Sequence, residues 1–486
     1  MTSDQGRVRT KNGFPRAPRV ARSLGRQFGY LWATFLVTGF GDGFGYGAVP
    51  LLALFVDPRP LPVSGVAAAD SFPWLVLALP AGALADRYER GRLMAVTNMS
   101  RALVLVTLGV LVATRHIDYM LLVILVFTNG GARAIYYSAS QATVPELVEA
   151  DDFSRANGIL TSTEAATQHL GGPIVGTLAF AASKAVPFVA DAAAVGLAGL
   201  SLLGFRTEKL ISGPAHGSIL DGARQLVKDR SLRLLVTLLA SLAALQGLVA
   251  GVLVIVATVD WGVSKNLYGV FLAVGAAGNV LGALLADRIA NRIGNIATVI
   301  VSAIISGLAY LVMATARGWL VAGAAFFVVG FAVCAGSVVA VSLRQRLSPR
   351  KLMGRVGSAW RGIVWGAIPI GSLIGGALAD KWGVRVPLYA AGAAQCIVAV
   401  LLAGRLSSSL AASERAATAG EASESLATSP DKDHPLSGTT ATASNGQVPP
   451  PALTLERQPA PTGRRLHAKA GRGPLYWGRS SRNSRR

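Results

Sequence analysis

The 486-residue chain is 52% hydrophobic and only 15% charged, with a mean hydropathy of +0.48. Soluble domains carry about 25% charged residues, so this composition excludes an ordinary soluble globular protein. The formal net charge of +21 would suit a nucleic-acid-binding protein, but its distribution along the chain indicates a membrane protein that binds no nucleic acid.

Apolar stretches of roughly 20 residues, the length that crosses a bilayer core, recur along the chain. Backbone polar groups in lipid must be bonded internally, so each stretch predicts a helix. We therefore predict an all-α membrane protein with twelve transmembrane helices in two pseudo-symmetric six-helix halves. The predicted spans are 29–56, 64–85, 93–114, 118–142, 155–181, 184–205, 233–258, 266–286, 295–315, 318–342, 356–379 and 384–404.

The spans divide the chain into five regions: an N-terminal segment (1–28), a first half (29–205), a middle loop (206–232), a second half (233–404) and a tail (405–486). The middle loop contains an amphipathic helix around Ser218–Arg230, which either lies on the membrane surface or covers the bundle. The tail is rich in Ser, Thr, Ala, Pro and Gly and ends in arginines. We expect it to be disordered, and either to touch anionic lipid or to have no function of its own.

Lysine and arginine are distributed unequally between the two sides of the predicted bundle. If the N-terminus is cytoplasmic, the cytoplasmic segments before the tail hold 24 of these residues and the outer loops hold 7. Cytoplasmic loops of membrane proteins carry such an excess. The sequence thus predicts a multi-pass protein of the plasma (inner) membrane with both termini in the cytoplasm.

A charged turn follows the second span and recurs after the eighth. The first copy reads Gly82-Ala-Leu-Ala-Asp86-Arg87-Tyr-Glu-Arg90-Gly-Arg92. The second copy keeps the glycine, the carboxylate and part of the basic cluster, as Gly282, Asp287, Arg288 and Arg292. A motif that returns about 200 residues later indicates an internal duplication, and the second copy departs further from the pattern.

Twelve spans, a longer middle loop and this repeated turn resemble the major facilitator superfamily. Finer features resemble the branch of the enterobactin exporter and the macrolide-efflux proteins. They are the form Asp-Arg-x-x-Arg-x-Arg at 86–92, Val144-Pro-Glu-Leu-Val148 followed by Ser154-Arg-Ala-Asn157, and the basic run from Arg346 to Arg355. The resemblance covers residues 29–404.

The resemblance implies two halves around a central cavity that opens alternately to either side. It also implies that Asp86 lies at the positive N-terminal end of span eleven and latches the halves together on the inside. Arg87, Arg90 and Arg92 would pair with neighbouring acids or lipid phosphates, or serve only as positive-inside anchors. The latch at Asp287 is expected to be the weaker one.

The fifth span carries Gly171-Gly172-Pro173-Ile-Val-Gly176. This run resembles the glycine- and proline-rich antiporter motif of exporters in the superfamily, although its upstream glycines are absent. Small residues at this spacing favour a helix that kinks and packs closely. The motif supports export.

Ionisable residues at membrane depth are costly and are candidate functional groups. Asp42 lies among five alternating glycines of span one, Glu164 lies in span five with Gln168 on the same face, and His169 is adjacent. Carboxylates in a cavity can exchange protons near neutral pH, so Asp42 and Glu164 are the first candidates for a proton carrier. The alternative is a fixed pair with Arg133 or Arg101. For His169, the alternative is a role in helix packing, and Asp70 and Asp191 could simply reach the outer interface.

The second half has no comparable charges apart from Arg361, so proton coupling is expected in the first half. The chain carries no phosphate-binding loop, metal-ligand cluster or nucleophile–base pair, so we expect a transporter without cofactor or metal rather than an enzyme. We predict a secondary active exporter that works by alternating access and exchanges protons for hydrophobic or amphipathic small molecules, either drug-like or siderophore-like. Alternatives are an importer, a lysolipid-flipping protein of the same fold, and a membrane sensor or scaffold.

Overall fold

The computed structural model describes residues 24–149, 152–205, 220–349 and 352–427. All regular secondary structure in these residues is helical. Nine of the described helices are long and apolar enough to cross a membrane, by length and composition. The prediction of an all-helical chain with many membrane-length helices is confirmed for this part of the molecule.

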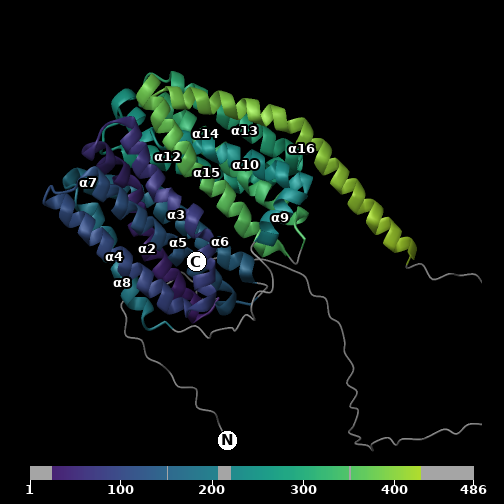
Figure 1. The fold of residues 1–486 in the computed structure, drawn as a ribbon, viewed down its shortest axis with the longest axis horizontal. Coiled ribbons are helices and arrows are strands. Elements are labelled where there is room, and N and C mark those ends of the chain that lie inside the picture. Colours follow the sequence, from purple (N-terminus) through teal and green to yellow (C-terminus); the bar gives the residue numbers. More distant parts are fainter. Residues whose placement is uncertain (1–23, 150–151, 206–219, 350–351, 428–486) are drawn as a thin grey trace, which may run out of the picture. The chain divides into compact units, whose positions relative to one another are not determined.

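The first group of helices runs from purple through blue to teal at α8 in Figure 1, and every predicted span of residues 29–205 has a helical counterpart in it. Helix α4 packs against α8 and α5, α3 packs against α5, and α2 packs against α7 and α8. The members are α2 (Arg26–Val56), α3 (Pro60–Arg87), α4 (Arg90–Ala113), α5 (Tyr119–Leu147), α6 (Phe153–Glu164), the π-helical segment η2 (Ala165–Gly171), α7 (Gly172–Ala182) and α8 (Val186–Leu202).

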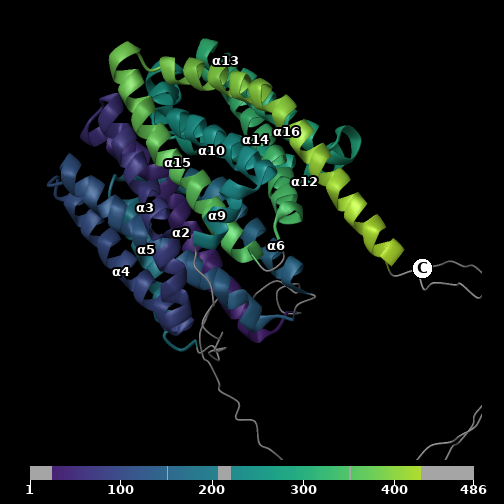
Figure 2. The same ribbon diagram turned by 45° about the vertical axis from the view of Figure 1, so that its right-hand side comes forward.

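The second group is coloured teal to yellow, and in Figures 1 and 2 its helices lie beside the first group. Within it, α12 packs against α14, α10 against α15, and α13 against α14. The members are α10 (Arg230–Ala250), α11 (Leu253–Ile255), the π-helical segment η3 (Val256–Asp260), α12 (Tyr268–Ile293), α13 (Asn295–Thr315), α14 (Trp319–Leu347), α15 (Met353–Trp382) and α16 (Val386–Ala427).

Several helix ends are set by their local sequence. Asp118 accepts a hydrogen bond from the backbone N–H of Leu121, which satisfies a free donor at the start of α5. Asp229 caps α10 in the same way. Helices α12 and α15 end at Gly294 and Gly383, whose φ angles of 88° and 102° favour glycine.

The fifth predicted span is not one regular α-helix but α6, η2 and α7 in succession. Pro173 at the start of α7 has no N–H to donate to the carbonyl four residues earlier. The N–H of Gly172 instead bonds to Thr167, five residues back, which closes a π-helical turn. The antiporter-like motif therefore widens the helix directly after Glu164.

Glycines let α12 and α14 approach until their backbones touch. A Cβ atom at Gly278 would lie 2.1 Å from the carbonyl oxygen of Phe327, and one at Gly282 would lie 2.2 Å from that of Phe331. On the facing helix, a Cβ at Gly330 would lie 2.1 Å from the carbonyl oxygen of Gly275. Small residues at these positions are required for van der Waals packing between membrane helices.

We expect Gly278→Ala to lower the thermal unfolding temperature of the detergent-purified protein. The new methyl group meets backbone atoms, which cannot rotate away, and overpacking of this kind costs about 1–3 kcal/mol. Gly362→Ala is the matched control, because a Cβ added at Gly362 would meet no described atom within 4 Å. Equal unfolding temperatures for Gly278→Ala and the parent would contradict the close packing of α12 on α14.

The two groups meet through α3 against α15 and through α7 and η2 against α12. Ser64 Oγ donates a 2.9 Å hydrogen bond to the carbonyl of Gly251, and a Cβ at Gly376 would lie 2.6 Å from the Cβ of Ser64. On the other side, a Cβ at Gly269 would lie 2.2 Å from the carbonyl oxygen of Pro173. These contacts all lie toward the end that the charge distribution assigns to the outside.

Helix α9 (Leu220–Lys228) forms part of the predicted amphipathic helix, while residues 218–219 lie outside the described chain. Leu226 is buried, and Gly222 lies directly against the backbone of Arg355 in the first turn of α15. Val227 on the predicted apolar face is 62% exposed. The burial of Leu226 thus supports the alternative in which this helix covers the bundle. The sequence did not decide between that alternative and a helix lying on the membrane surface.

Helix α16 extends to Ala427, well beyond residue 404, where the disordered tail was expected to begin. The sequence from Ser409 to Ala427 is rich in alanine and glutamate, which are good helix formers, and contains no proline. Helix propensity therefore outweighs the polar composition over these residues. By contacts, the chain to Glu424 is one unit and a second begins at Ser425; residues 428–486 lie outside the described chain.

Candidate substrate and proton site

A cavity of about 320 Å³ lies between α2, α3, α5, the α6–η2 segment and α15. Apart from Trp365 and Ile368 of α15, its lining residues come from the first group. The structure brings all five of the predicted substrate or proton candidates to this cavity: Asp42, Arg133, Glu164, Gln168 and His169.

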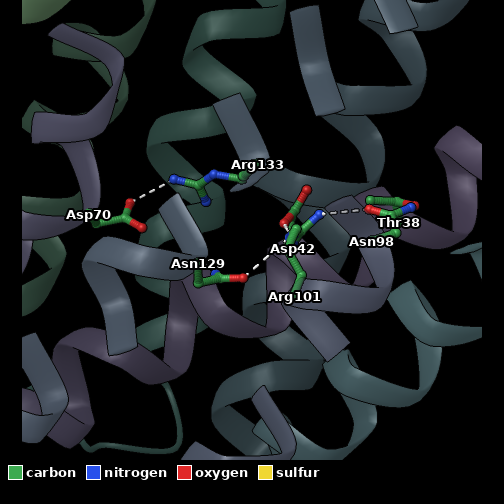
Figure 3. Close-up of polar contacts among 7 residues, drawn as sticks. All are labelled: Thr38, Asp42, Asp70, Asn98, Arg101, Asn129 and Arg133. Carbon is green, nitrogen blue, oxygen red and sulfur yellow. Dashed lines mark hydrogen bonds and ion pairs between the residues drawn. The ribbon is translucent and has the colours of Figure 1, made fainter. Parts of the chain in front are cut away.

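Asp42 is bound to a fully buried arginine. The guanidinium of Arg101 in α4 donates to the Asp42 carboxylate, and its Nε donates to Asn129 Oδ1 at 3.2 Å (Figure 3). Asn98 lies beside Arg101 and its amide donates to Thr38 of α2 at 3.4 Å. A buried charge needs such partners. In this structure Asp42 is therefore in a fixed ion pair, one of the two alternatives from the sequence, and Arg101 is its partner.

Asp70 of α3 forms a second pair with Arg133 of α5, at 2.8 Å from Nη2 to Oδ2 (Figure 3). Asp70 lines the cavity, so it does not simply reach the outer interface. The Nε atom of Arg133 is buried without a hydrogen-bond partner in the described structure. Asp42 and Asp70 of the first group are thus each engaged by an arginine.

Glu164 differs from the two aspartates, because no cation among the described residues pairs with it. It is the last residue of α6, directly before the π-helical segment, and it lies close to Tyr137 of α5, which lines the same cavity. His169 contacts Tyr46 edge-on, with ring centroids 5.4 Å apart. Because a π-helical turn changes the register after Glu164, it alters the face on which Gln168 and His169 lie.

Asp191 of α8 is almost completely buried, with 1% of its surface exposed. Its Oδ1 atom has no hydrogen-bond partner in the described structure, and its carboxylate lies against Gly41 and Gly45 of α2. One alternative from the sequence placed this residue at the outer interface. Two glycines without side chains leave room for the carboxyl group inside the bundle instead.

The five alternating glycines of span one are contact positions on two faces of α2. Gly39, Gly43 and Gly47 meet the fifth span, whereas Gly41 and Gly45 meet Asp191. The reciprocal contacts come from the antiporter-like motif: Gly172 lies against Gly43, Pro173 against Gly47, and Gly176 against the backbone of Phe44. Gly171 has looser contacts. The motif therefore joins the fifth span closely to the helix that carries Asp42.

A second cavity of about 140 Å³ lies in the second group and shares Trp365 and Ile368 with the first. Its polar lining is neutral and includes Gln246, Ser302, Ser306, Ser337 and Gln395, of which Gln395 donates to the carbonyl of Ala303 at 3.2 Å. These residues were overlooked in the sequence. A signal was available, since uncharged polar side chains such as glutamine also stand out in membrane-length apolar runs.

Trp74 of α3 connects the two groups and was also overlooked. Its ring contacts Tyr137 at 5.6 Å and Trp365 at 5.2 Å between centroids, with the ring planes steeply inclined in both pairs. Trp365 belongs to the second group, so the contact depends on the tertiary arrangement. Only the position of these aromatics in the middle of predicted spans could have indicated it.

The residues of the charged turn have different surroundings. Arg90 forms a 2.7 Å pair with Glu146 of α5 and also donates to the carbonyls of Ala85 and Ala142, while Arg92 pairs with Glu89 at 3.0 Å. These arginines pair with neighbouring acids, as one alternative proposed. The Arg87 guanidinium lies 5.9 Å from the Tyr88 ring centroid.

The predicted latch lies partly outside the described residues. The side chain of Asp86 is not among them, while Asp287 and Arg288 are described and are exposed. The two motif glycines also differ. Gly282 packs against Phe331 of α14, whereas a Cβ at Gly82 would meet no described atom within 4 Å.

Comparison with solved structures indicates the same fold. The nucleoside transporter NupG has a TM-score of 0.62 at 13% identity, covering 76% of this chain and 98% of that one. A bacterial homologue of the human lysosomal transporter Spinster, inward-facing and unoccupied, gives 0.62 at 13% identity over 80% and 98%. A bacterial homologue of the iron transporter ferroportin, inward-facing, gives 0.57 at 16% over 77% and 98%.

Sequence comparison gives the family. Uncharacterized MFS-type transporters of Mycobacterium tuberculosis (strain H37Rv) and Mycobacterium bovis are each 29% identical to this chain over 156 residues, 32% of its length. That match spans only 35% of each relative. A family model described as transmembrane secretion effector matches residues 23–431. The chain therefore belongs to this family of major facilitator membrane transporters, which are not enzymes.

Proposed function

We propose that the chain is a proton-coupled exporter of hydrophobic or amphipathic small molecules, working by alternating access between two six-helix halves. The observation that carries the proposal is Glu164, a carboxylate in the cavity wall without a cation partner among the described residues. A carboxylate that no cation holds in its ionised form can take up and release a proton during transport. Asp42, bound to Arg101, has a structural role in this scheme.

The family description as a secretion effector and the close packing of Gly172, Pro173 and Gly176 on α2 support export. The finer resemblance to the enterobactin-exporter and macrolide-efflux branch points the same way. The contacts of Ser64, Gly251 and Gly269 are those expected of a state closed on the outside, and two of the solved structures with a similar fold are described as inward-facing. Transport would require these contacts to separate while the inner ends of the helices approach.

The proposal is tested with a panel of compounds in cells that contain or lack the protein. We expect at least one amphipathic compound to accumulate less in cells with the protein, and an uncoupler to abolish the difference. Greater accumulation in the cells with the protein would support an importer instead. No difference for any compound, together with an effect of deleting residues 405–486 on cell behaviour, would support the sensor or scaffold.

The orientation follows from the distribution of Lys and Arg, with both termini in the cytoplasm of the cell. A reporter inserted near Ser264, between η3 and α12, should be detected outside the cell, and one fused after Ala427 should be detected inside. Detection of either reporter on the opposite side would reverse the assignment.

We further propose that Asp86 stabilises the outward-open state by lying at the N-terminus of α15 on the inside. Asp86→Asn should reduce transport while leaving expression intact, since each ~1.4 kcal/mol of lost interaction shifts a two-state equilibrium tenfold. Asp287→Asn should have a smaller effect, because Asp287 is exposed in a more divergent motif. The measurement is the transport rate of both variants. A larger loss of transport in Asp287→Asn than in Asp86→Asn would refute this asymmetry.

A further inference from the structure

We propose that the substrate is an organic cation, bound in the first cavity with Glu164 as its counter-charge and with Trp74, Tyr137 and Trp365 as its aromatic wall. This inference rests on the transport function proposed above and names the chemical class of the transported molecule. Three observations carry it: the charge balance of the cavity, the aromatic cluster beside Glu164, and the neutral lining of the adjoining cavity.

The charge balance of the first cavity leaves one carboxylate available. Arg101 engages Asp42, and Arg133 engages Asp70 at 2.8 Å. Glu164 lines the same cavity and has no cation partner among the described residues. When Glu164 is ionised, a bound cation therefore supplies a compensating positive charge, whereas an anion would bring a further negative charge beside an unpaired carboxylate.

The aromatic cluster lies directly beside this carboxylate. Tyr137 lies close to Glu164 in the cavity lining, and the Tyr137 ring meets Trp74 at 5.6 Å. Trp365, 39% exposed, meets Trp74 from α15 at 5.2 Å. The faces of tryptophan and tyrosine rings attract cations, by about 2 kcal/mol where water is excluded. A cation with apolar or aromatic substituents fits both the rings and the carboxylate.

The adjoining cavity indicates where the rest of the molecule lies. It shares Trp365 with the first cavity and contains no acidic or basic side chain in its described lining. Gln246, Ser302 and Ser306 offer neutral hydrogen-bonding groups there. The uncharged part of the substrate would extend past Trp365 toward these residues.

Protons and the cation compete for Glu164 in this arrangement, because protonation removes the negative charge that holds the ligand. Affinity for the cation should therefore decrease as the pH falls. The other titratable or charged groups of this region belong to α2, α4, α3, α5, η2 and α15: Asp42, Arg101, Asp70, Arg133, Tyr136, Tyr137, His169 and Arg361.

The test measures binding of two ions of the same shape and opposite charge, tetraphenylphosphonium and tetraphenylborate, to the purified full-length protein in detergent. We expect the phosphonium to bind more tightly than the borate, and more tightly at pH 8 than at pH 5.5. Glu164→Gln should weaken phosphonium binding about tenfold or more and remove its pH dependence. Trp74→Ala should weaken it about five- to thirtyfold, and Trp74→Phe should restore most of the affinity.

Glu149→Gln is the matched control, because Glu149 is exposed beyond the end of α5, and it should bind the phosphonium like the parent. Tighter binding of tetraphenylborate, or unchanged phosphonium affinity in Glu164→Gln, would overturn the inference. The assay uses no proton gradient, so its failure is distinguishable from failure of the proposed function. If the protein exports a compound of the panel but does not bind the phosphonium, the proposal of proton-coupled export stands and only the assignment of a cationic substrate is wrong.

Discussion

Arg101→Met should produce the largest loss of stability of any variant considered, seen as a much lower thermal unfolding temperature and a low yield of monodisperse protein. Arg101 is fully buried and is hydrogen-bonded to Asp42 and Asn129. Its removal leaves the Asp42 carboxylate without a cation in the bundle, and breaking one partner of a buried pair costs about 3–5 kcal/mol.

The double variant Asp42→Asn/Arg101→Met should recover much of this loss, because it leaves no uncompensated charge. The exposed pair of Asp57 and Arg59 is the matched control. Hydrogen bonds from Arg59 lower the pKa of the Asp57 carboxyl, yet exposed ion pairs contribute little to stability. Arg59→Met should therefore have the same thermal unfolding temperature as the parent. If Arg101→Met also has the parental unfolding temperature, the Asp42–Arg101 pair does not hold α2 and α4 together.

Glu164→Gln should abolish export against a concentration gradient. The substitution keeps the size of the side chain, but it removes the titrating group. Coupling to a pH gradient is then lost, while downhill exchange at saturating substrate persists, since the cavity keeps its shape. The measurement is uptake of a panel-identified substrate into inside-out vesicles with an imposed pH gradient.

Glu149→Gln should pump at the parental rate in the same vesicles. Uphill transport by Glu164→Gln at that rate would show that another group carries the proton. Asp191 would then be the first to consider, because it is a buried carboxyl of the first group whose Oδ1 lacks a hydrogen-bond partner in the described structure. His169 would be the next.

The helices could be predicted from the sequence because the bilayer imposes a simple rule on them. Twenty apolar residues in succession have few alternatives to a helix, and the span 295–315 coincides with α13. The irregular spans were harder. Pro173 was recognised as a kink, but the π-helical turn before it depends on a hydrogen bond from Gly172 to Thr167 that no periodicity reveals.

The membrane charges and their possible arginine partners could be found from the sequence, but which of the pairs form could not. Asp42 and Glu164 look equivalent as isolated carboxylates in apolar runs. Only the packing of α4 against α5 and α8, with Arg101 turned inward, separates the paired Asp42 from Glu164. The sequence left the position of Asp191 open, because its burial depends on two glycines of another helix.

The aromatic cluster depends on even longer-range structure. Trp74 and Trp365 are far apart in the sequence and meet where α3 lies against α15. In a single sequence, only the position of both residues in the middle of predicted spans points to such a pair. The sequence also does not reveal that Trp365 lines both the charged and the neutral cavity.

The most direct test of proton coupling through Glu164 is the internal pH of proteoliposomes during downhill substrate flux, with no pH gradient imposed beforehand. For the parent protein we expect substrate movement in one direction to drive protons in the other, with an uncoupler collapsing the pH change. Glu164→Gln should move substrate without any pH change. Equal proton movement in the parent and in Glu164→Gln, or none in either, would contradict the account.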